Sequence, residues 1–508
     1  MNILTNQLAA FHHRRVGWTL RSVPVAPNVL LITLDQFRAD CLSIADHPLV
    51  KTPNLDRLAR AGVRFTRHFS QAAPCSPGRA SLYTGMYQMN HRVVTNGTPL
   101  DRRFDNVAWL ARRAGYTPTL FGYTDQSVDP RDTQGPNDPR LSTYEGILPG
   151  FDCEFLTPEP HELWINHLRK NGFDVPMNAH IALSTEPDRP EEFSISAFLA
   201  DHLCNWLHKQ DGPWFAHASF LRPHPPYAAA GKWSKEYDPA GVPMPIEPAA
   251  IRHPFHEAVM QLPESCAPAD DAGKRYMRAQ YYGMVSEVDS QVGRLLDTIT
   301  ELGMWDNTMI IVTADHADQL GDHGLRDKLG FFEQSYHILG IVRDPRHPNA
   351  HGTIVDKFTE NVDIVPTIAD ALGEPVPLQC DGLPLTPFIE GRVPQWWRTA
   401  ASWEFDWRHI YITKEGRSWP WDRRIDRQHL AVRRSIDAAY VQFGDGSWLA
   451  FDLAIDPTWR TTIDDPARVL PLAQDMLLWH SHNTERTLTG LLMKDGGMGQ
   501  WPTGVPWR

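Results

Sequence analysis

A continuous apolar run, Asn28-Val-Leu-Leu-Ile-Thr-Leu34, constrains the fold of this chain more than any other feature. The run has the length of a strand, and because its residues do not alternate with charged ones, both faces of that strand have to be covered. Strands of this kind are typical of parallel sheets that carry helices on both faces. The run ends at Asp35, so an acidic side chain follows the carboxyl end of the strand.

Helices and short apolar runs alternate along the chain after this strand. A first helix begins at Thr52-Pro53 and stops at Gly62, as its cap and stop residues indicate. Later helix–strand pairs are 107–113 with 117–122, 195–208 with 214–220, and 276–302 with 309–313. The alternation predicts an α/β fold, with a large mixed, mostly parallel sheet flanked by helices. Ligands bind such sheets at the carboxyl ends of the strands.

The pattern changes at about residue 375. Short runs predict antiparallel strands at 431–434, 439–443 and 448–451, followed by a helix over 469–482. The turn Gly444-Asp445-Gly446 predicts a hairpin between the last two strands. We therefore expect three parts, which are an N-terminal arm over 1–27, a catalytic domain over 28–374, and a smaller C-terminal antiparallel α+β subdomain with a tail over 375–508.

The charge and the cysteines exclude several classes of protein. A net charge of −12 argues against a nucleic-acid binder, which needs a concentrated basic surface. The six cysteines are scattered without a CxxC pair, so they predict neither a zinc site nor a disulfide framework. Residues 1–27 lack the apolar segment of a signal peptide, and no run has the length of a membrane span. We expect a cytoplasmic protein that binds neither nucleic acid nor membrane.

One cysteine, Cys75, lies in the segment Pro74-Cys75-Ser76-Pro77-Gly78-Arg79. The residues from Arg79 to Thr84 predict a helix that Gly85 closes. The thiol would then lie at a helix N-terminus beside a cation, where an anion is stabilised. On these features alone, a structural cysteine on a turn is the simpler interpretation.

The longer pattern resembles a known motif. Cys75-x-Pro77-x-Arg79, followed by Leu82-x-Thr84-Gly85, resembles the signature of type I sulfatases in the alkaline phosphatase superfamily. The resemblance implies that a formylglycine-generating enzyme oxidises Cys75 to formylglycine. One hydroxyl of the hydrated aldehyde would attack the sulfur or phosphorus of a small anionic ester, and the second would re-form the aldehyde and expel the inorganic product.

Two polar pairs follow predicted strands and complete the predicted site. These are Asp35-Gln36 and Asp315-His316. A lone aspartate after a strand is commonly a helix cap, but two carboxylates, an amide oxygen and an imidazole together suit one hard divalent cation, Ca²⁺, Mn²⁺ or Mg²⁺. The group derived from Cys75 would complete the metal's ligand shell. Such a metal would polarise the ester and lower the pKa of the attacking hydroxyl.

The identity of the two pairs narrows the resemblance. Asp-Gln and Asp-His are similar to the choline-sulfatase and phosphonate monoester hydrolase branches. Further strings favour the phosphonate monoester hydrolase/arylsulfatase group, and these are Met89-Asn90-His91-Arg92, Gly122-Tyr123-Thr124, Asp129-Pro130-Arg131, Pro136-Asn137-Asp138-Pro139-Arg140, Arg222-Pro223-His224-Pro225-Pro226 and Gln319-Leu320-Gly321-Asp322-His323. The similarity runs in register from about Asn28 to Thr489.

The resemblance assigns roles to single residues. Arg79 would hold and polarise the hydrate, and Lys328 would bind a non-bridging oxygen of the ester. His224 would contact the bridging oxygen and protonate the leaving group. Asn96 and Tyr123 would line the pocket for the substrate oxyanion. Taken singly, each of these residues also has a structural explanation, for example a turn at Asn96 before Gly97.

Two departures from the group concern specificity and assembly. Asp125 stands where phosphonate monoester hydrolases carry a threonine, and a carboxylate at the pocket should disfavour dianionic esters. We therefore predict a preference for singly charged esters. The stretch 261–274 is shorter than an insertion associated with oligomer contacts in that group, so we expect a homo-oligomer whose assembly differs.

Three alternatives remain open at this point. The first is a dedicated sulfatase, either choline-sulfatase-like or specific for aryl sulfates. The second is a non-catalytic binder of sulfated or phosphorylated ligands, although a binder needs no activated nucleophile. The third is a hydrolase that uses Cys75 as an unmodified, metal-bound thiolate.

Overall fold

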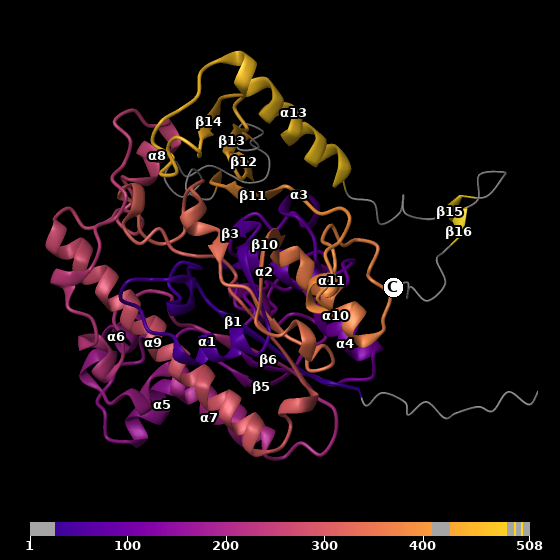
Figure 1. Cartoon of the computed structure of the whole chain (residues 1–508). Helices are drawn as coiled ribbons and strands as arrows, with labels where there is room; N and C mark the ends of the chain where they lie inside the picture. The colour runs from indigo at the N-terminus through magenta and orange to yellow at the C-terminus, as the bar shows by residue number, and fades with distance from the viewer. Residues whose placement is uncertain (1–25, 409–426, 485–491, 494–498, 501–508) are drawn as a thin grey trace, which may run out of the picture.

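The α/β architecture is present in a computed structural model of the chain, which describes residues 26–408, 427–484, 492–493 and 499–500. A nine-stranded sheet forms its centre, with the order β10-β2-β9-β7-β1-β6-β4-β5 and β8 beside β2 (Figure 1). Its strands are β1 (Asn28–Leu34), β2 (Val63–Phe69), β4 (Pro118–Gly122), β5 (Asp152–Leu156), β6 (Phe215–Phe220), β7 (Thr308–Thr313), β8 (His337–Ile338), β9 (Ile341–Arg343) and β10 (Thr353–Glu360). The predicted arm over 1–27 lies almost wholly outside the described residues.

The predicted strand β1 occupies the middle of the sheet and runs parallel to both neighbours, β6 and β7. Leu34 is in register with Phe220, and Thr33 with Thr313. Asp35 and Asp315 therefore leave the sheet at the same edge. The sheet is mixed because β9 pairs antiparallel with both β2 and β7.

Helices cover both faces of the sheet, as the uniformly apolar β1 requires. On one face Leu30, Ile32 and Leu34 pack against helices, and on the other face Val29 and Leu31 do so. The first face is covered by α1 (Pro53–Arg60), α5 (Glu162–Lys170), α6 (Ala179–Ser184), α7 (Ile195–Leu207) and α9 (Asp271–Glu301). The second face is covered by α2 (Cys75–Thr84), α4 (Val107–Arg113), α10 (Ile364–Leu372) and α11 (Thr386–Ile389).

The helix predicted over 276–302 begins earlier in the structure, at Asp271. Asp270 caps it by accepting the backbone N–H of Gly273 at 2.6 Å, a signal that the apolar periodicity of the sequence does not contain. Short helices outside the two layers are α3 (Gln88–His91) and α8 (Pro254–Val259). Among the described residues, no helix combines the length and apolarity needed to cross a membrane.

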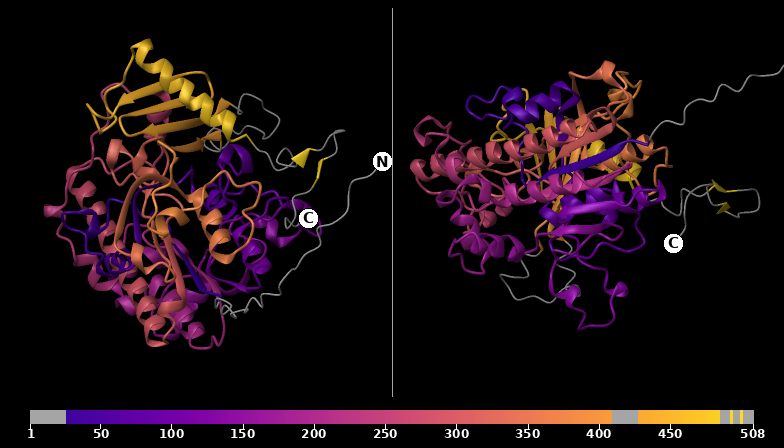
Figure 2. Two further views of the ribbon diagram at one scale, coloured as in Figure 1. Left: turned by 45° about the vertical axis from the view of Figure 1, so that its right-hand side comes forward. Right: turned by 90° about the horizontal axis from the view of Figure 1, so that it is seen from below.

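A second, five-stranded sheet with α13 (Pro466–His482) forms one end of the molecule (Figure 2). Its order is β14 (Trp448–Asp452), β13 (Ala438–Phe443), β12 (His429–Ser435), β11 (Ala400–Asp406) and β3 (Ala72–Ala73). The predicted hairpin is confirmed, because β13 and β14 pair antiparallel. No sequence pattern predicted β3, which pairs parallel with β11 and is separated from Cys75 only by Pro74. The smaller sheet therefore reaches the segment that carries the predicted nucleophile. Farther along the chain, β15 (Leu492–Met493) pairs with β16 (Gly499–Gln500).

Candidate active site

Cys75 is the first residue of α2 and is almost fully buried. Its Sγ lies 3.4 Å from Nε2 of His316 and 3.4 Å from Nζ of Lys328. Close packing sets this position, because a Cβ at Gly78 would come within 2.5 Å of the carbonyl oxygen of Asp315. Glycine thus lets the first turn of α2 lie directly against the end of β7. The helix stops as predicted at Gly85, which adopts a left-handed conformation with φ of 71°.

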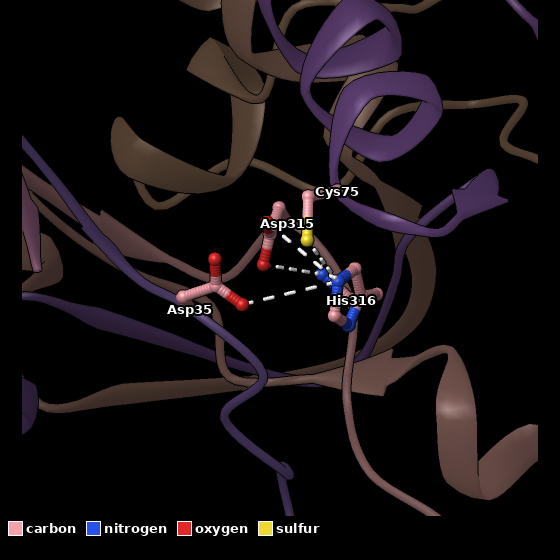
Figure 3. Close-up of side chains that lie close together, drawn as sticks. All are labelled: Asp35, Cys75, Asp315 and His316. Atoms are coloured by element: carbon pink, nitrogen blue, oxygen red, sulfur yellow. Dashed lines mark hydrogen bonds and ion pairs between the residues drawn. The ribbon is translucent and has the colours of Figure 1, made fainter. Parts of the chain in front are cut away.

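The predicted metal ligands converge on this cysteine. Asp35, Cys75, Asp315 and His316 each offer a ligand atom, and these atoms lie within 4.8 Å of one another (Figure 3). Nδ1 of His316 lies 3.2 Å from the carbonyl oxygen of Ala317, which can only accept, so Nδ1 carries the proton and the Nε2 lone pair faces the cluster.

The donor chemistry of this cluster fits a cation. Oδ1 of Asp35 is buried and has no hydrogen-bond partner among the described residues. A buried carboxylate oxygen without a donor is costly unless a positive charge compensates it. Carboxylate oxygens and a neutral imidazole are ligands that divalent cations accept.

Two acids that the sequence analysis missed orient Gln36. Its Nε2 donates to Asp318 at 2.6 Å and to Asp327 at 3.0 Å. Because carboxylates only accept, the amide oxygen is turned the other way, where it accepts from Lys328 at 3.2 Å. Tyr227 in turn donates to Asp318 at 2.9 Å. The sequence contains these residues close to the predicted motifs, but nothing in their spacing predicts that they meet.

Arg79 is completely buried and holds the two aspartates of the cluster. Its guanidinium donates to Asp315 at 2.9 Å and to Asp35 at 3.1 Å. A third donor reaches Oγ of Ser219 at 2.8 Å, and the guanidinium lies 4.3 Å from the ring centre of Tyr123. These contacts make Arg79 a residue that positions the carboxylates. Contact between Arg79 and a hydrate at position 75 stays a prediction.

Tyr123 and Asp125 lie on the same side of the site. The Tyr123 hydroxyl donates to Asp35 at 2.6 Å. Asp125 lies 3.7 Å from Nε of Arg79, but its Oδ1 has no hydrogen-bond partner in the described part of the chain. Burial raises the pKa of Asp125 well above its usual range. The sequence alone suggested that an ionised Asp125 would repel a negatively charged ester. With its raised pKa, a protonated Asp125 would instead donate a hydrogen bond to an ester oxygen.

Lys328 and His224 form a pair beside Cys75. Nζ of Lys328 lies 2.8 Å from Nε2 of His224. Nδ1 of His224 lies 2.7 Å from the carbonyl oxygen of Pro225. Nζ of Lys328 also lies 3.4 Å from Sγ of Cys75, so the pair lies next to the candidate nucleophile.

The loop that carries His224 is braced by a buried arginine. Arg222 donates to the carbonyl oxygen of His224 at 2.7 Å and to that of Pro226 at 3.0 Å. Its Nε donates to Glu186 at 3.1 Å, and both side chains are about 1% exposed. Pro223 and Pro225 restrict the backbone on either side of His224. The structure adds Arg222 and Glu186, which sequence spacing does not reveal.

Asn96 contacts the backbone of the residue that follows Cys75. Its side-chain oxygen accepts the backbone N–H of Ser76 at 2.9 Å, one residue beyond Cys75. Asn96 therefore supports the first turn of α2. Its contact with a substrate oxyanion stays a prediction.

A cavity of about 580 Å³ opens over the cluster. Five of the predicted residues line it, namely Asp35, Cys75, Tyr123, Asp125 and His224. This volume is in the range of small-molecule sites in proteins and exceeds what a sulfuryl or phosphoryl group alone would fill. The cavity can therefore accommodate an organic ester next to Cys75 and His224.

Comparisons with known proteins show the family of this chain. Residues 27–374 match the family model described as Sulfatase. The chain is 36% identical over 503 residues to the multifunctional alkaline phosphatase superfamily protein PehA of Trinickia caryophylli, a match that covers 91% of this chain and 96% of that protein. It is 30% identical over 385 residues to a choline-sulfatase of Rhizobium meliloti, covering 72% of each chain.

Solved structures of two phosphonate monoester hydrolases are similar to this chain. A phosphonate monoester hydrolase of Agrobacterium radiobacter superposes with a TM-score of 0.85 at 41% sequence identity, covering 94% of this chain and 100% of that one. A phosphonate monoester hydrolase of Silicibacter pomeroyi superposes with a TM-score of 0.84 at 34% identity, covering 93% and 99%.

Proposed function

The chain belongs to the sulfatase family of the alkaline phosphatase superfamily and is a hydrolase of that family; from this premise we propose that it hydrolyses both sulfate esters and phosphonate monoesters or phosphodiesters. The observation that carries the proposal is the environment of Cys75. A single nucleophile position lies within 3.4 Å of both Lys328 and His316, at the floor of a cavity large enough for an organic ester.

We propose that residue 75 acts after conversion to formylglycine by a formylglycine-generating enzyme, which supplies a hydroxyl nucleophile. Burial raises the pKa of the Cys75 thiol well above its usual range, so without a metal the thiol form is favoured over the thiolate. The N-terminus of α2 favours negative charge at this position, and Asn96 supports that first turn through Ser76. As the family resemblance implies, Arg79 would also hold and polarise the hydrate.

One divalent cation, Ca²⁺, Mn²⁺ or Mg²⁺, would be held by Asp35, Gln36, Asp315 and His316 together with the side chain at position 75. When bound, it supplies Lewis acidity toward the ester oxygen and lowers the pKa of the attacking hydroxyl. The chain prepares the site with Arg79, which orients the carboxylates, and with the acids that turn the Gln36 amide.

Lys328 and His224 would act on the ester itself. An ammonium at the position of Lys328 neutralises charge that builds on a non-bridging oxygen as the bond to the leaving group breaks. The pair also provides the proton that the leaving oxygen needs, through His224 at the bridging oxygen. Both groups are held in place before substrate arrives, since they contact each other at 2.8 Å.

Tyr123 and Asp125 would shape the pocket for the oxyanion, with Asn96 at its edge. We propose that the site prefers singly charged esters, since a protonated Asp125 can donate one hydrogen bond to an ester oxygen but supplies no positive charge to balance a dianion. Rates of the Asp125→Thr variant on a phosphate monoester and on a sulfate ester test this. An unchanged rate ratio would remove Asp125 from the explanation.

The test of the proposed function is a comparison of rates on an aryl sulfate, an aryl phosphodiester and an aryl phosphonate monoester. Wild-type protein is expected to hydrolyse all three, and Cys75→Ala none of them. Cys153→Ala is the matched control, because Cys153 is exposed on β5. Mass spectrometry of the peptide that contains Cys75 should show the aldehyde, and full activity with an intact thiol would refute the mechanism.

The same experiment separates the alternatives. Turnover of the sulfate alone would identify a dedicated sulfatase, for which the choline-sulfatase similarity is the supporting observation. Binding of all three esters without turnover by fully modified protein would identify a non-catalytic binder. The proposal also includes a homo-oligomer in the cytoplasm, which sedimentation and cell fractionation would test.

A further inference from the structure

Asp327 lies directly before Lys328 and has an unusual backbone conformation. Its φ of 64° is in the left-handed region, which favours glycine and which aspartate and asparagine tolerate better than most other residues. The backbone N–H of Asp327 donates to Asp318 and to the hydroxyl of Tyr227, each at 3.1 Å. Its carbonyl oxygen accepts the N–H of Gln319 at 2.7 Å. These bonds fix Asp327 in one position at the edge of the site.

The left-handed residue brings two opposite charges together beside the candidate nucleophile. Consecutive side chains of an extended chain point to opposite sides. Here Oδ1 of Asp327 lies 3.4 Å from Nζ of Lys328, and it accepts Nε2 of Gln36 at 3.0 Å. The nearby ammonium favours the ionised carboxylate. Asp327 lines the same cavity as Cys75, and its side chain is 25% exposed, so its charge lies next to space that a substrate can enter.

Asp327 differs from the other acids of the site in the cation that it shares. Asp35 and Asp315 share the guanidinium of Arg79 and belong to the candidate metal cluster. Asp327 instead shares Lys328, the cation proposed to bind a non-bridging oxygen of the ester. The two side chains together carry no net charge. The pair therefore offers an ester the hydrogen bonds of an ammonium with only part of its attraction for negative charge.

An ester oxygen that Lys328 binds would also lie close to the Asp327 carboxylate. A hydrogen bond from an ammonium to an anionic oxygen has a length of about 2.8 Å. Because Nζ lies 3.4 Å from Oδ1 of Asp327, that oxygen can be no farther than about 6 Å from Oδ1. Like charges at this distance near a protein surface repel each other enough to change an equilibrium constant by about tenfold or more. Each negative charge added to the ester increases this repulsion.

We propose that Asp327 is a specificity-determining residue, whose negative charge beside Lys328 disfavours esters that carry a second negative charge. This inference rests on the proposed ester hydrolysis, with Lys328 as the group that binds a non-bridging oxygen. Sulfate esters, phosphonate monoesters and phosphodiesters are singly charged, whereas a phosphate monoester is a dianion at pH 8. The discrimination is thus assigned to an ionised carboxylate, while Asp125 contributes through its hydrogen bond alone.

The test compares 4-nitrophenyl phosphate with methyl 4-nitrophenyl phosphate at pH 8 and saturating Mn²⁺. The two esters share their leaving group, and the methyl group removes one negative charge. In Asp327→Asn, the ratio of kcat/KM for the dianionic ester to that for the singly charged ester should rise by about tenfold or more over the wild type. Asparagine tolerates the left-handed backbone, and its side-chain oxygen can still accept from Gln36, so the charge is the main property removed.

Two further variants separate the charge of Asp327 from its position. Asp327→Glu keeps the negative charge and should keep the ratio of the two rates low. Asp356→Asn is the matched control, because Asp356 also directly precedes a lysine, Lys357, but both lie exposed on β10. Its ratio should equal that of the wild type.

The outcomes distinguish this inference from the proposed function. An unchanged ratio in Asp327→Asn, including an equal loss of rate on both esters, would overturn the inference and show that Asp327 only positions its neighbours. Hydrolysis of the aryl sulfate, phosphodiester and phosphonate monoester by the wild type would still support the proposed function in that case. If fully modified wild-type protein hydrolysed none of these esters, the proposed function would fail, and this inference would fail with it.

Discussion

Nζ of Lys328 lies 2.8 Å from Nε2 of His224, beside Cys75. A lysine ammonium has no lone pair, so Lys328 donates and His224 accepts. The other ring nitrogen of His224 faces the carbonyl oxygen of Pro225 at 2.7 Å and therefore carries the imidazole proton. In this arrangement the proton shared by the pair belongs to Lys328, and His224 can donate to a leaving oxygen only after it has accepted that proton.

This relationship predicts that the two residues work as one proton-donating unit. Lys328→Ala and His224→Ala should each lower kcat/KM by about 10²–10⁴-fold for esters of weakly acidic phenols, and by much less for 4-nitrophenyl esters. The double variant should lose little more than either single variant, because the effects of a coupled pair do not add. Rates over a series of phenols measure this, with the exposed Lys232→Ala as the control. Additive losses would contradict the coupling.

The buried Arg222–Glu186 pair should position His224 for that transfer. Arg222→Lys removes the fork that holds the carbonyls of His224 and Pro226, so kcat should fall more steeply for poor leaving groups than for good ones. Because lysine keeps a positive charge beside Glu186, the free energy of unfolding should fall by less than the roughly 3–5 kcal/mol expected when one partner of a buried pair is removed. Arg294→Lys on the surface controls for the substitution. A uniform loss across all leaving groups would indicate a structural role alone.

Asp318 should control metal affinity through Gln36. Asp318→Asn replaces an obligatory acceptor by an amide that can also donate, so the Gln36 amide loses its fixed orientation. Loss of such an orienting partner typically lowers metal affinity by about 10–100-fold. Calorimetric titration of metal-free protein with Mn²⁺ and Ca²⁺ measures the change. The exposed Asp297→Asn should titrate like the wild type, and an unaltered affinity in Asp318→Asn would refute the role.

Glu287 predicts a pH dependence of stability. It is buried on α9 and accepts hydrogen bonds from Ser194 and Ser196, and burial together with the nearby Glu186 charge raises its pKa from 4.5 to about 7. The folded protein therefore keeps a proton that the unfolded chain has already lost, so stability falls as the pH rises from about 4.5 to about 7.

The Glu287→Gln variant cannot lose this proton and should escape that decline. Its free energy of unfolding, relative to wild type, should rise by up to about 3 kcal/mol between pH 4.5 and 7 and stay level above pH 7. Denaturant unfolding at several pH values measures this difference. A constant difference across the range would show that the Glu287 proton is not linked to folding.

Trp403 should be a main contact between the two sheets. It is fully buried on β11, and its ring stacks on Phe69 at 5.7 Å and on Tyr336 at 5.0 Å. Trp403→Ala should lower the free energy of unfolding by about 3–5 kcal/mol, because it leaves a large cavity. The exposed Trp396→Ala should change it by less than about 0.5 kcal/mol. Equal losses in both variants would contradict the packing argument.

The sequence alone determined the central architecture. The uniformly apolar run Asn28–Leu34 could be buried only inside a sheet covered on both faces, so it predicted the layers and the edge at which Asp35 emerges. The end of the helix at Gly85 and the turn at 444–446 could also be predicted from sequence, since both depend on local backbone preferences. Local signals of this kind do not need knowledge of distant partners.

The sequence predicted the site residues that follow strand ends or belong to the motif around Cys75. The tertiary structure determined the other contacts of the site. Asp318 reaches Gln36 across 282 positions of the chain, and Arg222 reaches Glu186 across 36. Neither contact follows from periodicity or spacing, because each depends on how loops from different strands pack above the sheet.

The protonation of Asp125 was decided in the same way. Burial and neighbouring groups set the protonation of a carboxyl, and those neighbours are brought together only by the folded chain. The sequence determined which chemical groups stand at the ends of the strands, and the tertiary structure determined which of them meet.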